Sequence, residues 1–497
     1  MLLAAGVGLL AAAGCGSGGH DGGRSTPHRE SIIGRENRKP GSDAWQFWRH
    51  GYVAADDVVE QVKGYASATS VNHGEAITFY VSVAAPQAYT IDVYRLGWYG
   101  GLGGSLAIRL GPLAGQRQGE CPVDAVTGLI ACDWMPSAEL AVPPAWVSGI
   151  YVAVVQTEAR FAGFIPFVVR DDERSADFVY QQSVTTYQAY NDYPADGRRG
   201  KSLYGSSFGP PTIAGNPRAV AVSFDRPYAG DGAGQLFDWE IDFVRFLERE
   251  GYDVAYTTDL DTHARGERLL RSRAFLSVGH DEYWSAAMYD AIERARDRGV
   301  NLGFFGANAA YWQVRFEPSA AGAPDRIMVC YKDATLDPVQ GAAATVQWRD
   351  PLVGRPVQVL IGIQYGGIIA GGRDGAYADY VVRDAGHWVY ADTGLVDGDV
   401  IPGIVGYEAD GFDPASPGPS ARAGTVAFLS RSPFVSFSGS TFEAGSAVYQ
   451  APSGAWVFAA GTIGWSLGLD DFGDRAVPDR RLQQATRNVL DAFAAVH

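Results

Sequence analysis

Three titratable side chains, His280, Asp281 and Glu282, directly follow an apolar run over residues 274–279. The run is short and ends on a glycine, which predicts a buried strand with these side chains at its carboxyl end. A histidine two residues before a glutamate at such a place could supply a metal ligand with a general acid or base beside it. The alternative is a buried hydrogen-bonded cluster that ties the loop down. Asp281 is expected either to face solvent or to cap the following helix.

A polar, glycine-containing segment, residues 185–205, concentrates aromatic side chains upstream of this histidine. It carries Tyr187, Tyr190, Tyr193 and Tyr204. Loops of this kind usually serve packing or sugar stacking. Residues 205–209 formally match the G-x-S-x-G motif of serine hydrolases, but no apolar strand leads into them and two prolines follow, so the motif lacks its structural context. Zinc-ligand patterns such as C-x-x-C are absent from the sequence.

The elements that must position these residues alternate between strand and helix from about residue 219. Strands are predicted at residues 219–224, 252–261, 274–280 and 300–308, and helices at residues 236–251 and 286–298, the second with Ser285 as its N-cap. This order predicts a mostly parallel, doubly wound sheet, whose functional positions lie beyond the carboxyl ends of its strands. His280 to Glu282 follow one strand and Asn308 ends the next, so we expect them at one crevice.

Regions rich in β-structure flank this pattern. Alternating apolar and polar residues predict an Ig-like β-sandwich over residues 46–172. Residues 173–497 then form the α/β domain. From about residue 335 to residue 460 the alternation returns, which predicts a β-rich insertion packed on the same domain. The fold class expected is therefore α/β plus β.

Size and charge limit the function further. A chain of 497 residues with 46% hydrophobic residues exceeds what one core usually serves and can bury two. Its formal net charge is -16. Nucleic-acid binding needs a basic face, so the composition argues against a nucleic-acid partner.

The first residues predict export. Residues 1–45 begin with an apolar segment too short to span a bilayer and continue as a polar, glycine-rich tether. The residues before Cys15 resemble a bacterial lipoprotein cleavage site, so a lipid on Cys15 is the expected membrane contact and secretion is the alternative. In an exported protein, Cys121 and Cys132 are expected to form a local disulfide rather than two free thiols. Cys330 is expected to be a small core residue.

Eight segments between about residue 64 and residue 470 resemble the large (beta) subunit of N,N-dimethylformamidase and its exported relatives. They are "GYASATSVNHGE", "VYRLGWYGG", "TTYQAYNDY", "SLYG", "SVGHDEYWS", "GVNLGFFGANAAYWQVRFE", "IVGYEADG" and "GTIGWSLGLD". The most specific are "GHDEYWS" and "FFGANAAYWQ". The resemblance implies a glutamine-amidotransferase-like α/β catalytic domain without a cysteine nucleophile. It also implies hydrolysis of a small amide at a mononuclear iron, held by two tyrosines and one glutamate.

The resemblance also implies which residues carry this chemistry. The glutamate ligand falls on Glu282, and the tyrosine ligands fall best on Tyr190 and Tyr204, with Tyr187 as the fallback. The loop between the tyrosines is much shorter here than in the amidase. His280, Asn308 and Glu408 match the remaining polar positions as catalytic residues.

These residue types suit one Fe(III) per chain, because phenolate and carboxylate are hard anionic ligands. Iron would polarise the carbonyl of a small amide substrate. His280 or Glu408 would carry protons, and Asn308 would hold the carbonyl oxygen or orient the water. The family's amidase also works with a small second subunit, so an accessory subunit or a homo-oligomer is a partner to be tested.

A different class of function is the competing hypothesis. A tethered, non-catalytic cell-surface protein on the same fold would bind a saccharide or peptide through aromatic loops. The aromatic residues that motivate this hypothesis are Trp98, Tyr99, Trp284 and Trp312.

Overall fold

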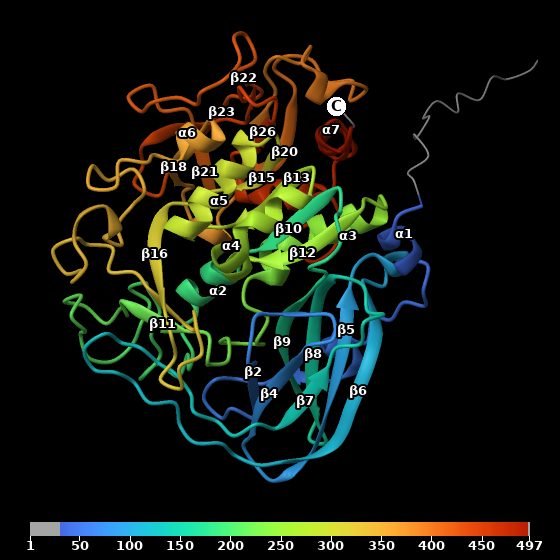
Figure 1. Ribbon diagram of the computed structural model, residues 1–497, viewed down its shortest axis with the longest axis vertical. Coiled ribbons are helices and arrows are strands. Elements are labelled where there is room, and N and C mark those ends of the chain that lie inside the picture. The colour runs from blue at the N-terminus through green and yellow to red at the C-terminus, as the bar shows by residue number, and fades with distance from the viewer. Residues whose placement is uncertain (1–29, 496–497) are drawn as a thin grey trace, which may run out of the picture.

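Two β-sheets enclose the first core of the protein, in the part of the chain coloured blue to cyan in Figure 1. The computed structural model describes residues 30–495, so the expected signal segment and Cys15 lie outside the described residues. One sheet has six strands in the order β1-β9-β8-β5-β6, with β3 also paired to β9, and the other has the order β2-β4-β7. Inward-facing side chains such as Phe79, Ile91 and Phe167 fill the space between them.

The strands of these two sheets are β1 (Val53–Ala54), β2 (Val62–Ala66), β3 (Ser70–Asn72), β4 (Ala76–Val83), β5 (Gln87–Leu96), β6 (Gly104–Gly115), β7 (Ala138–Ala141), β8 (Gly149–Thr157) and β9 (Phe161–Arg170). A short helix, α1 (Ile32–Glu36), precedes them and contacts α3 of the next part of the chain. The two sheets fall within the range predicted for a sandwich.

The second part of the chain is built on a seven-stranded sheet of order β12-β10-β13-β15-β26-β25-β22. Its strands are β10 (Phe178–Gln182), β12 (Val254–Thr258), β13 (Ala274–His280), β15 (Asn301–Ala307), β22 (Ala427–Phe428), β25 (Ala447–Gln450) and β26 (Trp456–Ala459). The first five in this order are mutually parallel. Numbered along the chain they run 2-1-3-4-5, a common doubly wound order whose switch point lies between β10 and β13.

Helices cover both faces of this sheet. The helix α3 (Ile241–Arg249) packs Phe243 with Leu276 and Phe305 in one core, which also holds α7 (Arg480–Ala494). On the other face, α5 (Ala286–Asp297) packs Met288 and Ile292 with Phe275 and Phe304. Because side chains of successive strand residues point to opposite faces, β13 contributes Phe275 to one core and Leu276 to the other. The predicted α/β architecture with additional β-structure is confirmed at this level.

Three local predictions differ from the structure. Residues 219–224 do not enter the main sheet: β11 (Ala221–Ser223) pairs with β17 in a separate four-stranded sheet, and the first strand of the main sheet is β10. Strand β10 ends on two glutamines, which conceal it in a search for apolar runs. The strand predicted at residues 252–261 ends at Thr258, because Thr258 and Asp261 form a capping box that starts α4 (Asp259–Arg265). The helix predicted at residues 236–251 begins as a π-helical turn, Leu236–Glu240.

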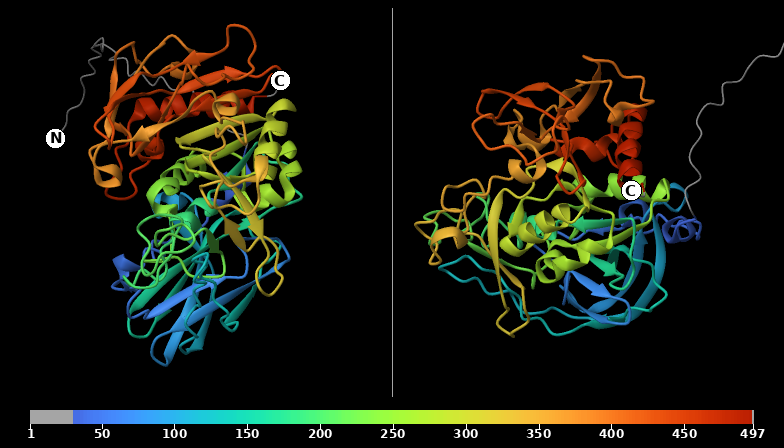
Figure 2. Two further views of the ribbon diagram at one scale, coloured as in Figure 1. Left: turned by 90° about the vertical axis from the view of Figure 1, so that its left-hand side faces the viewer. Right: turned by 45° about the horizontal axis from the view of Figure 1, so that its top comes forward.

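The region predicted as a β-rich insertion is only partly a separate layer. Its β22 and β25 extend the main sheet, next to β26. The remaining strands form small sheets: β18 (Gln364–Ile368) with β21 (Glu408–Gly411), β19 (Ala378–Val381) with β20 (Val400–Val405), and β23 (Ser432–Val435) with β24 (Thr441–Ala444). A short helix, α6 (Gln358–Ile361), precedes β18. In both views of Figure 2 this orange to red region lies on the side of the α/β sheet away from the blue sandwich.

The other described α-helices and strands are α2 (Val184–Tyr190), β14 (Tyr283–Ser285), β16 (Trp312–Glu317) and β17 (Ile327–Val329). Within residues 30–495, none of the helices has the length and apolar character needed to cross a membrane.

Candidate active site

Strand β13 delivers His280 and Glu282 to the carboxyl edge of the sheet. All seven residues of β13 are buried, and Gly279 adopts a positive φ of 68° just before His280. Gly279 lies opposite Gly306 of β15, and a Cβ on Gly306 would lie 2.1 Å from the Gly279 carbonyl oxygen. The two glycines therefore allow a close approach of the strands directly beneath the candidate site.

Two tyrosines meet the Glu282 carboxylate at the switch point between β10 and β13. Tyr190 ends α2, the helix that follows β10, and its hydroxyl donates to Oε2 of Glu282 at 2.9 Å. Tyr204 comes from the loop beyond, and its hydroxyl lies 3.0 Å and 2.8 Å from the two oxygens of Glu282. The rings stack with centroids 4.1 Å apart. The structure thus gathers the three side chains assigned as ligands by resemblance.

His280 links this group to the residues assigned as catalytic. Its Nε2 lies 3.3 Å from Oε2 of Glu282 and 3.3 Å from Oε2 of Glu408, which comes from β21. Asn308 donates from Nδ2 to Oε2 of Glu408 at 2.7 Å. A carboxylate only accepts hydrogen bonds, so this contact fixes which end of the amide faces Glu408. Oδ1 of Asn308 and both ring nitrogens of His280 are buried without a hydrogen-bond partner among the described residues, so the two 3.3 Å contacts of Nε2 are ion-pair contacts.

Asn308 has a left-handed backbone conformation. Its φ is 56°, a value that asparagine adopts more readily than most residues. Its backbone N–H donates to Oδ1 of Asp410 at 2.8 Å. Glu408 and Asp410 are alternate residues of β21, so they point to the same side and bind the side chain and the backbone of Asn308 together.

Charge and burial set the protonation of this cluster. Burial alone would lower the pKa of His280, but Glu408 and Glu282 outweigh it and raise that pKa to about 10. Burial, and then the Glu282 charge, raise the pKa of Tyr190 and of Tyr204 well above the usual value. Burial opposes ionisation of Glu282, yet contact with His280 holds its pKa below the usual value. The arrangement is a neutral phenol pair on a carboxylate, with an imidazolium between two carboxylates.

Two residues that sequence reasoning missed complete the cluster. Nζ of Lys332 donates to the Tyr283 hydroxyl at 2.7 Å, and that hydroxyl donates to the Tyr204 hydroxyl at 2.6 Å. The ammonium also lies 3.6 Å from the centroid of the Tyr204 ring. Burial lowers the pKa of Lys332 to about 8. Lys332 is one of only four lysines in the chain, and this scarcity was a usable signal.

Two residues, Tyr187 and Asp281, lie elsewhere than expected from the sequence. The hydroxyl of Tyr187, the fallback ligand, donates to Glu240 rather than approaching Glu282. Asp281 neither faces solvent nor caps the helix, because it is buried and accepts hydrogen bonds from Ser277, Gln181 and the Trp284 indole, each at 2.8 Å. Ser285 is the N-cap of α5, as predicted.

The aromatic residues that motivated a binding-protein function do not form one exposed platform. Trp284 and Tyr99 are buried. Trp98 lies under the guanidinium groups of Arg245 and Arg249, and Trp312 lies 4.9 Å from the Lys332 ammonium. These four residues therefore give that hypothesis no common surface.

The donor set at Glu282 fits a hard trivalent metal ion. In residues 30–495 no group of three or more His, Cys, Asp or Glu side chains could hold a metal, and the candidate set differs because two of its three ligands are phenols. Their oxygens already converge within 3.0 Å of the Glu282 carboxylate. A cation here would reverse the pKa shifts of the phenols, since it stabilises phenolate.

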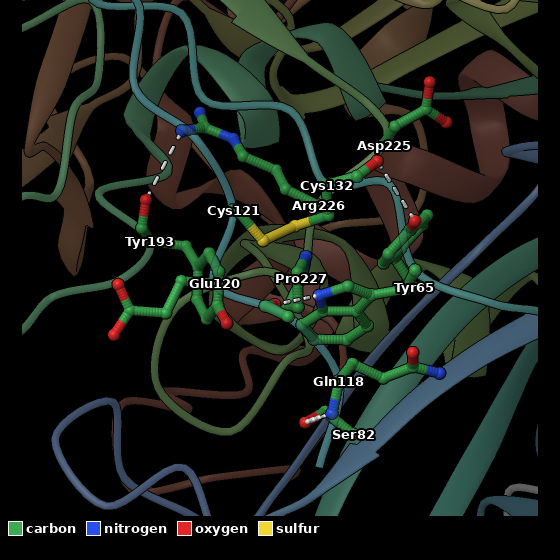
Figure 3. The surroundings of a disulfide bond; sticks show 12 residues. Tyr65, Ser82, Gln118, Glu120, Cys121, Cys132, Tyr193, Asp225, Arg226 and Pro227 are labelled. Atoms are coloured by element: carbon green, nitrogen blue, oxygen red, sulfur yellow. Dashed lines mark hydrogen bonds between the residues drawn. A yellow bond between two sulfur atoms is a disulfide. The ribbon is translucent and has the colours of Figure 1, made fainter.

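A disulfide packs against Tyr193, which lies between the two site tyrosines in the sequence. Cys121 and Cys132 are bonded to each other and pack with Tyr65 and Tyr193 (Figure 3). Trp134 belongs to the same cluster. The Cys132 backbone N–H donates to the carbonyl of Asp225 at 2.7 Å, which joins the β6–β7 loop to the second part of the chain. Cys330 is a free, buried thiol, as expected for a core residue.

The fold and the site define a mixed α/β protein with a buried cluster of phenols, carboxylates, imidazole and amide at the switch point of a doubly wound sheet. The family described as N,N-dimethylformamidase beta subunit-like, C-terminal, matches residues 90–479, and the chain belongs to this family. The membership confirms the resemblance seen in the sequence and indicates a hydrolase of the dimethylformamidase type.

The similarity of the chain to other known proteins is low. No curated protein matches the chain. Among solved structures, the alkylpurine DNA glycosylase AlkC from Pseudomonas fluorescens, bound to DNA with an abasic site analogue, is similar with a TM-score of 0.14 and 20% identity, over 22% of this chain and 30% of that one. A cycloisomaltooligosaccharide glucanotransferase from Paenibacillus sp., complexed with cycloisomaltoheptaose, has a TM-score of 0.18 and 9% identity, over 81% of this chain and 68% of that one.

Proposed function

We propose that the protein is an exported hydrolase that cleaves the carbon–nitrogen bond of a small amide with one Fe(III) per chain. The observation that carries the proposal is the convergence of the Tyr190 and Tyr204 hydroxyls on the Glu282 carboxylate, within 3.0 Å and next to His280. These three side chains would hold the iron. When bound, iron supplies a Lewis acid that polarises the amide carbonyl.

The protein's own groups account for the proton transfers. His280, which lies beside Glu282 and Glu408, can donate a proton to the departing amine nitrogen as the carbon–nitrogen bond breaks. Glu408 can take the proton of the water that adds to the carbonyl carbon. The 3.3 Å contact between Glu408 and His280 then returns that proton to the imidazole, so the cycle closes without a net change in the protein.

Asn308 is suited either to orient the water or to hold the carbonyl oxygen. Its Oδ1 has no partner among the described residues and can accept from water, and Nδ2 gives only one of its two N–H groups to Glu408. The second N–H can donate to the carbonyl oxygen.

The test is a visible spectrum of the purified protein beside elemental analysis, because a tyrosinate bound to Fe(III) gives a charge-transfer band. We expect about one iron per chain, and loss of iron and band in Glu282→Ala, Tyr190→Phe and Tyr204→Phe. Tyr187→Phe is the matched control, since its hydroxyl binds Glu240, and should keep both. Protein that stays colourless and metal-free after reconstitution with iron would contradict the iron centre. Amine release from a panel of small amides tests the reaction itself.

The proposal also covers the fold type of each part of the chain, the export of the protein and its partner subunits. We propose that the paired sheets are an Ig-like sandwich and that the doubly wound domain is glutamine-amidotransferase-like. The signal-like start of residues 1–45 would direct export, with a lipid on Cys15 as the membrane contact. An intact-mass measurement on membrane-extracted protein should show the lipid and the loss of the preceding residues.

Light scattering of the purified protein tests for a homo-oligomer, and co-purification tests for a small accessory subunit.

A further inference from the structure

A cleft lies at the end of the central sheet opposite the candidate active site. It has a volume of about 570 Å³ and is lined by residues around β22, by the start of β26 and by the loop after β19. Trp456 is the first residue of β26, and β26 runs parallel to β15, which carries Asn308 at its far end. The cleft therefore borders the amino ends of the parallel strands and shares no residue with the candidate active site.

Two tryptophans form one wall of the cleft. The rings of Trp388 and Trp456 lie with centroids 5.4 Å apart and planes at 66°, and both side chains are half-buried. Two rings at such an angle offer apolar surfaces that a ligand can contact from two sides. Nε1 of Trp388 is buried and has no hydrogen-bond acceptor among the described residues. An unpaired buried N–H is costly to the folded protein.

Charged groups of both signs line the same cleft. Arg383, Asp384 and Asp397 are exposed, and Asp384 is held at a positive φ of 55°. Asp397 accepts the backbone N–H of Ala385 at 2.7 Å, which fixes its position. The side chains of Arg383 and Asp384 make no hydrogen bond or ion pair within residues 30–495, so their polar atoms are available to a ligand.

We infer that this cleft is a binding site for a neutral saccharide. The C–H face of a sugar ring packs on an aromatic ring, and its vicinal hydroxyls pair with planar carboxylate and guanidinium groups, which is the combination that lines this cleft. Opposite charges in one cleft disfavour a strongly charged ligand of either sign. The volume falls within the range of small-molecule sites. The inference does not depend on the proposed amide chemistry.

The experiment is calorimetric and fluorescence titration of the full chain with maltohexaose, cellohexaose and chitohexaose, and with tetramethylammonium as a cationic probe. We expect one of the hexasaccharides to bind and to change the tryptophan emission, because two indoles line the cleft. Trp388→Ala should weaken that binding at least about tenfold. Trp48→Ala, at an exposed tryptophan of the first domain, is the matched control and should leave it unchanged.

A double variant at the rim keeps the test valid if a tryptophan variant fails to fold. Arg383→Ala with Asp384→Asn changes only exposed side chains and should also weaken binding. Amine release from amides should stay unchanged in both cleft variants, which separates this site from the candidate active site. The inference is overturned if no hexasaccharide binds at millimolar concentration, if binding survives both sets of variants, or if tetramethylammonium binds and the saccharides do not.

Discussion

Nε2 of His280 lies 3.3 Å from Oε2 of Glu408, although the two residues belong to different sheets. His280 ends β13 of the central sheet, and Glu408 starts β21 of the two-stranded sheet β18–β21. The contact exists because β21 packs against the carboxyl edge of β15, where the Asn308 backbone N–H donates to Asp410. The β-rich insertion thus brings Glu408 to His280, the partner in the proposed acid–base pair.

Glu408→Gln should abolish most activity while leaving the metal in place. The change removes the charge that contributes most to raising the pKa of His280, so that pKa should fall. It also removes the base proposed to accept the proton of water, and such groups contribute about 10²–10⁴-fold to rate. We expect kcat to fall by about 10²-fold or more, with iron content unchanged, as measured by amine release and elemental analysis. Glu443→Gln, at an exposed glutamate of β24, should keep full activity. A fully active Glu408→Gln protein would contradict this role.

Gly306→Ala should destabilise the protein. The new Cβ would meet the Gly279 carbonyl oxygen at 2.1 Å, and that oxygen belongs to the backbone of the neighbouring strand. Overpacking of this kind costs about 1–3 kcal/mol or more. Urea unfolding should show this loss, whereas Gly119→Ala, where no atom lies within 4 Å, should change the free energy of unfolding by less than about 0.5 kcal/mol. Equal stability of the two variants would show that the strands can separate without cost.

Glu240→Gln should change how stability depends on pH. Glu240 is buried and accepts hydrogen bonds from Tyr180 and Tyr187, and burial raises its pKa from 4.5 to about 8. Between these values the unfolded chain releases the proton and the folded protein keeps it, so rising pH favours unfolding. The stability of the wild type relative to the variant should fall from about pH 4.5 to pH 8, by at most about 1.4 kcal/mol per pH unit, and be flat outside this window.

A control for this pH effect has the opposite sign. Glu250 is paired with Arg487 and Arg249, which outweigh burial and lower its pKa. Its contribution is present above the pKa of the unfolded state and lost as the pH falls through the lower folded value. The wild type should therefore be more stable than Glu250→Gln at neutral pH, and this difference in the free energy of unfolding should shrink only as the pH falls into the acid range. Urea titrations at a series of pH values would show both trends, and parallel curves for the two variants would contradict the assignment.

The Cys121→Ser, Cys132→Ser double variant should lose stability. The bond closes a loop with a sequence separation of 11, and a loop of about this size corresponds to about 2–3 kcal/mol. The melting temperature of the wild type should fall in reductant, and that of the double variant should not respond. Cys330→Ala serves as the control that retains the bond, and its melting should remain sensitive to reductant. A wild type insensitive to full reduction would mean that packing alone holds the loop.

Local patterns in the sequence correctly predicted features that depend on a single helix or strand. The apolar run 274–279 and the helix capped by Ser285 were predicted because side-chain periodicity and capping act within a few residues. Strand β10 was missed because its second half is polar and buried by neighbours distant in the chain. For Glu408, the family resemblance supplied the position, since no local pattern marks a residue that becomes functional by packing on another sheet.

The sequence by itself determined the family, the α/β class with added β-structure, and the residue types at the site. The tertiary structure decided which tyrosine meets Glu282. Tyr187 and Tyr190 lie three residues apart on α2, and only the packing of that helix against the sheet directs one hydroxyl to Glu240 and the other to Glu282. It also brought Lys332 and Asp410 to the site and set the pKa values, because burial and neighbouring charges depend on contacts between residues far apart in the chain.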